Sequence, residues 1–323
     1  FDNNINQLIN PDNFVKQSLL VFAFQYENNT VYKTFCDLLG KSPSNVNEFT
    51  DIPFLPIQFF KTHNILSSKN TIQATFTSSG TTGNETSKHH ITNLKIYKQS
   101  YLKAFINFYG KIEDYLVLGL LPSYLERSGS SLIYMVNDFI QRSKYAESGF
   151  FLDDLEALKQ TLEKYDGKRQ ILLVGVSFAL LDFTEQFQLK LKSTIVMETG
   201  GMKGRRKELI REELHEKLKQ GFGVEQIHSE YGMTELLSQA YSLGNGIFKC
   251  PSSMKILIRN TENPLEILKT NEAGGINVID LANVNSVSFI ATQDLGKQVN
   301  SNEYQILGRF DHSDVRGCNL MVI

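Results

Sequence analysis

The pattern of apolar and polar positions predicts alternating helices and buried strands over the first two thirds of the chain. Apolar residues at helical spacing predict helices over 12–27 and 30–39, the first with Asp12 as its N-cap and the second ending at Gly40. The same spacing predicts helices over 93–109, 131–140, 153–165 and 207–218. Short apolar runs predict strands over 72–76, 115–122, 170–176, 193–199 and 227–228. The prolines within 52–61 keep that segment extended.

Beyond Tyr241 the pattern changes to short alternating strands separated by Gly and Asn turns. We expect strands over 253–259, 276–280, 286–291 and 304–307. The sequence therefore predicts an α/β fold with mixed sheets flanked by helices. We expect an α/β nucleotide- and acyl-binding core over residues 1–240, a small β-rich subdomain over 241–310 and a short polar C-terminal segment over 311–323.

Charge and cysteine usage exclude several classes of protein. The 323 residues carry a formal net charge of −2, which gives no electrostatic basis for binding nucleic acid. The longest apolar runs are too short for a membrane span. The three cysteines are odd in number and widely spaced, and the sequence starts with Phe1 and no signal-peptide pattern. These features favour a protein of the reducing cytoplasm without a disulfide framework.

The stretch TSSGTTG at 77–83 is the first candidate for chemistry. Its residues are small, hydroxylated or glycine, so backbone N–H groups and hydroxyls are available to a cluster of anionic oxygens. Its position between the predicted strand 72–76 and the helix that follows favours a phosphate-binding loop over a flexible linker. The Walker A pattern is absent. The adjacent His89 and His90 point to opposite sides of an extended chain, so we expect no metal site there.

Two further stretches present backbone at the carboxyl ends of predicted strands. TGG at 199–201 ends one strand and precedes a basic helix, and YGMTE at 231–235 follows the next strand. Ligands of doubly wound sheets usually bind at such strand ends.

These stretches stand in a known order. TSSGTTG, TGG, YGMTE, and TQDLG at 292–296 followed by LGR at 307–309 together resemble the adenylate-forming (acyl-CoA synthetase-like) superfamily. The resemblance is closest to the LuxE family, the acyl-protein synthetases of bacterial fatty acid reductase complexes. It includes IPFLPIQFFK at 52–61, PSYLERSGSSLIYM at 122–135, TGGMKGR at 199–205 and VRGCNL at 315–320, and it extends over nearly the whole chain.

The resemblance implies a role for each motif in binding ATP. The phosphates would be held by Ser78, Ser79, Gly80, Thr81, Thr82 and Gly83, with Thr234 touching phosphate and Glu235 coordinating Mg²⁺. Adenine would lie along Gly200 and Gly201, with Tyr231 and Gly232 at its plane and near the acyl carboxylate. Asp294 would accept both ribose hydroxyls, and Arg309 would help to fix the ribose. The plain alternatives are a helix-start acid for Glu235, a turn residue for Asp294 and a surface charge for Arg309.

The implied activity is ATP-dependent conversion of a fatty or aryl carboxylic acid to acyl-AMP, followed by transfer of the acyl group to a protein cysteine. Cys318 takes the place of the acceptor, and the neighbouring Arg316 would lower its pKa. The partner would be an acyl reductase or acyl-transferase subunit. The alternatives are an acyl- or aryl-CoA ligase and a non-catalytic nucleotide- or acyl-binding subunit of a complex.

The resemblance does not assign two features of the implied site, the lysine that contacts the α-phosphate and the lining of the acid pocket. Larger relatives carry a C-terminal domain whose lysine contacts the carboxylate and the α-phosphate, and no residue here can be assigned that role. Lys61, Lys88 and Lys203 are the candidates for a replacement. The apolar stretches 132–140 and 176–181 are expected to line the acid pocket.

Overall fold

Most of the strands join one large mixed sheet in the computed structural model, which describes residues 4–78, 86–122, 129–200 and 209–310. Within these ranges the sheet has twelve strands in the order β11-β12-β13-β14-β10-β9-β8-β7-β6-β4-β5, with β1 beside β13. Its strands are β1 (Leu55–Pro56), β4 (Tyr115–Leu120), β5 (Gly149–Phe150), β6 (Gln170–Val176), β7 (Thr194–Thr199), β8 (His228–Tyr231), β9 (Ala240–Ser242), β10 (Ile247–Lys249), β11 (Met254–Arg259), β12 (Ala273–Asp280), β13 (Phe289–Asn300) and β14 (Glu303–Arg309). The predicted α/β class is confirmed.

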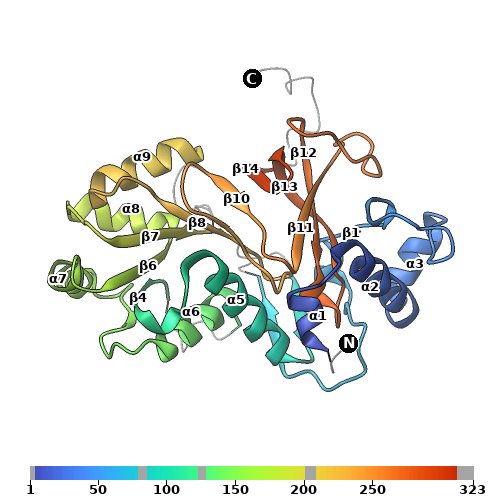
Figure 1. The fold of residues 1–323 in the computed structure, drawn as a ribbon, viewed down its shortest axis with the longest axis horizontal. Coiled ribbons are helices and arrows are strands. Elements are labelled where there is room, and N and C mark those ends of the chain that lie inside the picture. Colours follow the sequence, from blue (N-terminus) through green and yellow to red (C-terminus); the bar gives the residue numbers. More distant parts are fainter. Residues whose placement is uncertain (1–3, 79–85, 123–128, 201–208, 311–323) are drawn as a thin grey trace.

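The strands β5, β4, β6, β7 and β8 are parallel and form the α/β half of the molecule. Their apolar runs are buried on both faces, because helices cover both sides. The helices α5 (Leu94–Tyr109) and α6 (Ser131–Arg142) lie on one face, and α8 (Ser177–Gln186) and α9 (Arg211–Phe222) lie on the other (Figure 1). The helix α7 (Leu155–Tyr165) lies at the outer end, near β6.

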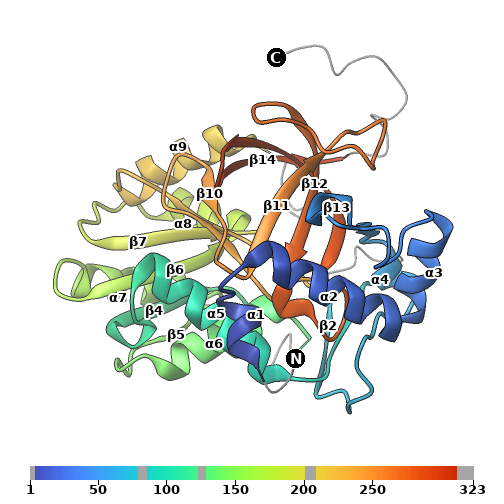
Figure 2. The ribbon, with the colours of Figure 1, turned by 45° about the vertical axis from the view of Figure 1, so that its right-hand side comes forward.

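The antiparallel strands β11 to β14 form the other half, where N-terminal helices pack (Figure 2). The helices are α1 (Ile5–Ile9), α2 (Phe14–Asn28), α3 (Thr30–Leu38) and α4 (Phe59–Thr62), with short 3-10 turns η1 (Phe49–Asp51), η2 (Ile112–Asp114) and η3 (Leu281–Asn283) elsewhere in the chain. Phe22 and Tyr32 meet Phe289 of β13 at ring-centroid distances of 6.2 and 6.1 Å. This aromatic cluster attaches α2 and α3 to the sheet.

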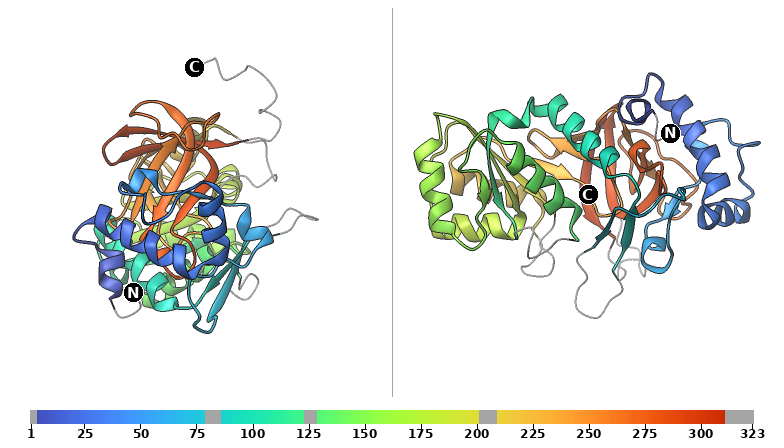
Figure 3. Two further views of the ribbon diagram at one scale, coloured as in Figure 1. Left: turned by 90° about the vertical axis from the view of Figure 1, so that its right-hand side faces the viewer. Right: turned by 90° about the horizontal axis from the view of Figure 1, so that it is seen from below.

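A separate two-stranded hairpin consists of β2 (Ala74–Thr77) and β3 (Lys88–Ile91), paired antiparallel. It projects beyond the large sheet as the cyan strands in the right-hand view of Figure 3. We predicted that TSSGTTG lies between a strand and the helix 93–109. The helix α5 does begin near residue 93, at Leu94, but the strand β3, which was not predicted, comes before it. The buried alternation of His89 and Ile91 explains the strand. TSSGTTG therefore falls between two strands of one hairpin.

Several predicted boundaries also need correction. Asn13, not Asp12, caps α2, since its side chain accepts from the Lys16 backbone at 2.9 Å. The segment 52–61 is not extended throughout, because it contains α4. The predicted strand 286–291 runs on to Asn300, so TQDLG lies within a strand. The helix predicted from residue 207 begins at Arg211. The sheet continues through β9 and β10, and the division into domains at residue 240 stays a prediction.

Candidate functional site

The TGG and YGMTE stretches meet at the carboxyl ends of neighbouring parallel strands. Thr199 at the end of β7 pairs with Glu230 of β8. Gly200 and Tyr231 are the residues that come next in each segment, so they lie at the same edge of the sheet. The Ser177 hydroxyl, at the start of α8, donates to the Gly200 carbonyl at 2.7 Å. The sheet therefore presents both stretches at the edge where ligands of such sheets bind.

Asp294 joins this edge from the other half of the molecule. The Tyr231 hydroxyl donates to Asp294 Oδ2 at 2.7 Å, and Arg309 Nε donates to Asp294 Oδ1 at 3.2 Å. Asp294 and Arg309 are direct partners in the β13–β14 ladder. Burial, together with the nearby Asp294 carboxylate, raises the pKa of Tyr231 well above its usual range, so the hydroxyl keeps its proton.

The hairpin brings the flank of TSSGTTG to the same place. The backbone of Ser87 donates to Ser78 Oγ at 3.0 Å, which closes the base of the intervening segment. The Ser87 side chain hydrogen-bonds to the Glu235 carboxyl group. Burial raises the pKa of Glu235, whereas the Ser87 hydrogen bond and the positive charge of Arg309 oppose that shift. The described parts of all four motifs therefore meet in one region, as the resemblance implied.

Comparison with known proteins identifies similar families and folds. The profile of the family described as "Acyl-protein synthetase, LuxE" matches residues 10–115. No curated protein sequence matches the chain. Solved structures of adenylate-forming ligases match it over most of its length.

The chain has the fold of adenylate-forming enzymes.

Three solved structures illustrate the likeness. ATP-bound MatB from Rhodopseudomonas palustris has a TM-score of 0.56 at 15% identity, covering 75% of this chain and 49% of MatB. O-succinylbenzoate coenzyme A synthetase (MenE) from Bacillus subtilis, in complex with AMP, has a TM-score of 0.54 at 20% identity. The match covers 76% of this chain and 51% of MenE. 2-Hydroxyisobutyryl-CoA ligase in complex with 2-HIB-AMP has a TM-score of 0.69 at 12% identity. The match covers 92% of this chain and 67% of the ligase. The chain thus spans about half the length of the first of these relatives.

The segment after Tyr231 is held in the adenylate-forming fold by residues that sequence analysis missed. Asp280, fully buried at the end of β12, accepts from the backbone of Leu237 at 2.7 Å and of Ser238 at 2.9 Å. Asn283 donates to the Glu235 carbonyl at 2.6 Å. No local pattern marks these residues, since their partners lie more than 40 positions away. They fix the backbone that carries Thr234 and Glu235.

Two buried acids lie beneath the strand ends, and they were also missed. Glu198 contacts Arg211 at 2.5 Å and His215 at 3.5 Å. Burial alone would raise the pKa of Glu198, but the His215 hydrogen bond and the Arg211 charge lower it. Among the described residues, the Thr199 hydroxyl is the donor to Glu230, and burial raises the pKa of Glu230 to about 7. The two acids therefore differ in charge near neutral pH.

A half-buried arginine contacts the TQDLG strand. Arg259 of β11 donates from Nη1 to Asn277 Oδ1 at 2.9 Å and from Nη2 to the Thr292 carbonyl at 2.6 Å. Gly275 makes room for it, because a Cβ there would lie 2.5 Å from the guanidinium carbon. Arg259 was not among the residues predicted from the sequence.

The remaining predicted residues divide into those that the structure describes and those outside it. Gly232 lies against Glu230, because a Cβ atom on Gly232 would come within 2.3 Å of a carboxylate oxygen of Glu230. Lys61 and Lys88 are exposed. Residues outside the described ranges are Ser79, Gly80, Thr81, Thr82, Gly83, Gly201, Lys203, Arg316 and Cys318. Cys36 and Cys250 are buried, and burial raises the pKa of each thiol to about 12, which fits packing roles.

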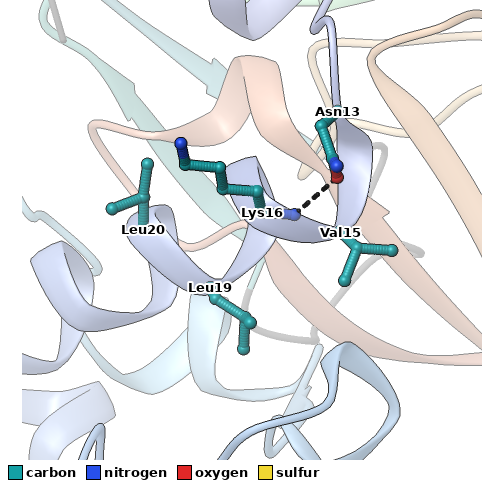
Figure 4. Close-up of a pocket in the computed structure, with 5 residues that line it drawn as sticks. All are labelled: Asn13, Val15, Lys16, Leu19 and Leu20. Carbon is teal, nitrogen blue, oxygen red and sulfur yellow. Dashed lines mark hydrogen bonds between the residues drawn. The ribbon is translucent and has the colours of Figure 1, made fainter.

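The expected acid-pocket segments lie on opposite faces of the sheet. Stretch 132–140 belongs to α6, and stretch 176–181 comprises the last residue of β6 and the start of α8 (Figure 1). Most of their apolar side chains are buried in the core. A shallow pocket on α2 is lined by Asn13, Val15, Lys16, Leu19 and Leu20 (Figure 4), outside the elements that carry the motifs. Within the described residues there is no group of three metal-ligating side chains and no helix long and apolar enough to cross a membrane.

Proposed function

We propose that the protein activates a fatty or aryl carboxylic acid with ATP to form acyl-AMP. The observation that carries the proposal is the meeting of Tyr231, Asp294 and Glu235 at the strand edge of an adenylate-forming fold. Structures with this fold include complexes with ATP, AMP and an acyl-AMP. The match of residues 10–115 to acyl-protein synthetases favours an acyl substrate.

In the proposed reaction the acid carboxylate attacks the α-phosphorus of ATP. A bond forms between carboxylate oxygen and phosphorus, the bond to the bridging oxygen breaks, and pyrophosphate leaves with that electron pair. Asp294 accepts the ribose hydroxyls, since a carboxylate suits a vicinal diol. The amides and hydroxyls of 78–83 and the Thr234 hydroxyl would bind phosphate. Adenine would lie along Gly200 and Gly201 at the strand edge, with Tyr231 and Gly232 at its plane.

Glu235 would hold Mg²⁺ in this site. Its carboxylate is a hard oxygen ligand, it is 5% exposed, and the described residues give it no cation within ion-pair distance. Bound Mg²⁺ would offset the charge of the phosphates. The carboxylate is buried, and among the described residues its hydrogen bonds come from the Ser87 side chain and from its own backbone, which are both uncharged donors. This setting fits a group that gains a cation on binding ATP.

The acyl acceptor in the proposal is Cys318. Its thiolate attacks the acyl carbonyl of acyl-AMP, a C–S bond forms, and AMP leaves with the electrons of the broken C–O bond. Cys36 and Cys250 are buried, and burial raises the pKa of each thiol to about 12, which disfavours the thiolate that a nucleophile needs. The thioester would then serve an acyl reductase or acyl-transferase subunit in the cytoplasm. Coenzyme A as the acceptor is the second candidate, and it is favoured by the CoA ligases among the structural neighbours.

The test is acid-dependent exchange of labelled pyrophosphate into ATP, run over a panel of fatty and aryl acids. Exchange with at least one acid is expected, and exchange with none would favour a nucleotide- or acyl-binding subunit. Incubation with ATP and the labelled acid then identifies the acceptor. Label on denatured protein that is lost in Cys318→Ser supports self-acylation, with Cys36→Ser as the matched control. Label only on added coenzyme A would overturn it.

A further inference from the structure

His89 of β3 links the hairpin to the YGMTE segment. Its side chain is fully buried, and its ring meets Phe60 edge-on at 5.5 Å. Its Nδ1 lies 2.8 Å from the carbonyl oxygen of Thr234, 145 positions along the chain. A carbonyl oxygen only accepts hydrogen bonds, so Nδ1 carries the hydrogen. Burial lowers the pKa of His89 to about 4, and the neutral ring therefore has a bare Nε2 that can only accept.

Three buried polar atoms near His89 lack a hydrogen-bond partner among the described residues. They are His89 Nε2, Thr92 Oγ1 and Asn283 Oδ1. All three residues line one small cavity, which leaves about 10 Å³ for the centre of a water molecule. That is room for one water. Asn283 already uses its amide nitrogen to donate to the Glu235 carbonyl, so its oxygen is the atom left without a donor.

One water molecule satisfies all three atoms at once. It donates one hydrogen to His89 Nε2 and one to Asn283 Oδ1, and it accepts the hydrogen of the Thr92 hydroxyl. Direct contact of His89 Nε2 with Asn283 Oδ1 would instead set two acceptors against each other. An unpaired buried acceptor is destabilising, so occupancy of the cavity by water is favoured.

We propose that His89, Asn283 and one buried water form a clamp on the peptide that carries Glu235. His89 holds the Thr234 carbonyl, Asn283 holds the Glu235 carbonyl, and the water joins the two side chains. Since β3 follows TSSGTTG in the hairpin, the clamp sets Glu235 relative to the phosphate-binding loop. His89 is thus a positioning residue for the adenylation reaction, and the inference rests on the proposed function.

The test compares three variants in pyrophosphate exchange. His89→Asn places an amide N–H where Nδ1–H lies, whereas His89→Leu removes the donor. We expect His89→Leu to raise the KM for MgATP about tenfold with a smaller change for the acid, and His89→Asn to recover most of the loss. His90→Leu is the matched control, because His90 lies on the same strand, is less buried and contacts Thr75 and Asn64 instead. An unchanged KM in His89→Leu would overturn the clamp.

Two further measurements do not depend on activity. ¹⁵N NMR of labelled histidine should show one ring with a protonated Nδ1 and a bare Nε2 that does not titrate above about pH 5, and this ring should be lost in His89→Asn. A high-resolution structure should show one water within hydrogen-bond distance of His89, Thr92 and Asn283. An Nε2-protonated ring or an empty cavity would contradict the proposal even if exchange occurs. Absence of exchange with every acid would remove the proposed function but leave these two results readable.

Discussion

Tyr231 at the end of β8 donates a 2.7 Å hydrogen bond to Asp294 within β13, and this bond joins the two halves of the sheet at the candidate site. Arg309 contacts the other carboxylate oxygen at 3.2 Å. Asp294 is 7% exposed, whereas the Arg309 side chain is 78% exposed. The buried tyrosine therefore sets the direction of the carboxylate, and the arginine contributes a weaker, solvent-screened contact.

The first prediction concerns Asp294 as a ribose ligand. Asp294→Asn should raise the KM for ATP roughly a hundredfold, because it removes a charged acceptor from both ribose hydroxyls. Tyr231→Phe should raise it only about fivefold, since the carboxylate stays and loses one neutral hydrogen bond. The measurement is pyrophosphate exchange with ATP and with 2′-deoxy-ATP. In Asp294→Asn the KM for 2′-deoxy-ATP should nearly equal the KM for ATP. If the ratio of the two KM values is the same as in the unsubstituted protein, Asp294 does not contact the ribose.

The second prediction concerns Glu235 and Mg²⁺. Glu235→Gln keeps the shape of the side chain and an acceptor for Ser87 but removes the charge that a cation needs. We expect the Mg²⁺ concentration for half-maximal exchange to rise at least tenfold, with an unchanged thermal unfolding midpoint in the absence of ATP. Glu303→Gln on β14 is the control, because Glu303 pairs with the exposed Lys249. An equal effect of both substitutions would point to general electrostatics.

The third prediction concerns the buried Glu230. Its folded-state pKa of about 7 lies above the ordinary value of 4.5, so the folded protein binds a proton that the unfolded chain releases. The stability from this group is therefore complete below pH 4.5 and is lost as the pH rises to about 7, by roughly 3 kcal/mol. Glu230→Gln should remove this slope, because Gln is neutral and still accepts from Thr199. Urea unfolding of the unsubstituted protein and of Glu230→Gln between pH 4.5 and about 7 tests this prediction. If the free energy of unfolding varies with pH in the same way in both proteins, the raised pKa of Glu230 is contradicted.

The sequence predicted the strands of the α/β half well, because parallel strands buried on both faces are continuous apolar runs. It also singled out Tyr231, Glu235 and Asp294, since each lies in a short recognisable motif, and their roles in binding ATP stay predictions. It failed at β3, where Lys88-His89-His90-Ile91 has polar residues on a strand whose buried face is made by tertiary contacts. The same reason explains why the roles of His89, Asp280 and Asn283 were not predicted. Their hydrogen-bond partners lie in distant segments of the chain, and no local sequence pattern indicates a buried polar pair.

The fourth prediction concerns Arg259, which joins three strands beneath Asp294. Its guanidinium donates to the Ile276 carbonyl at 2.6 Å, to Asn277 and to Thr292. Arg259→Met keeps a long side chain over Gly275 but removes three donated hydrogen bonds, and only the Ile276 carbonyl keeps a further side-chain donor among the described residues, the Thr292 hydroxyl. We expect the free energy of unfolding to fall by about 2–4 kcal/mol. Lys255→Met, on the same strand and without such contacts, should change it by less than about 0.5 kcal/mol.

The position of Arg259 separates a structural role from a role in binding ATP. Thr292, whose carbonyl accepts from Arg259, also accepts the Asp294 backbone N–H at 3.1 Å through its hydroxyl. Loss of the arginine should therefore displace Asp294 as well as destabilise the sheet. At a temperature where Arg259→Met is fully folded, the KM for ATP should still rise several-fold, while the KM for the acid stays within about twofold. If both KM values are unchanged under these conditions, Arg259 acts on stability alone and the orientation of Asp294 depends on Tyr231 and Arg309.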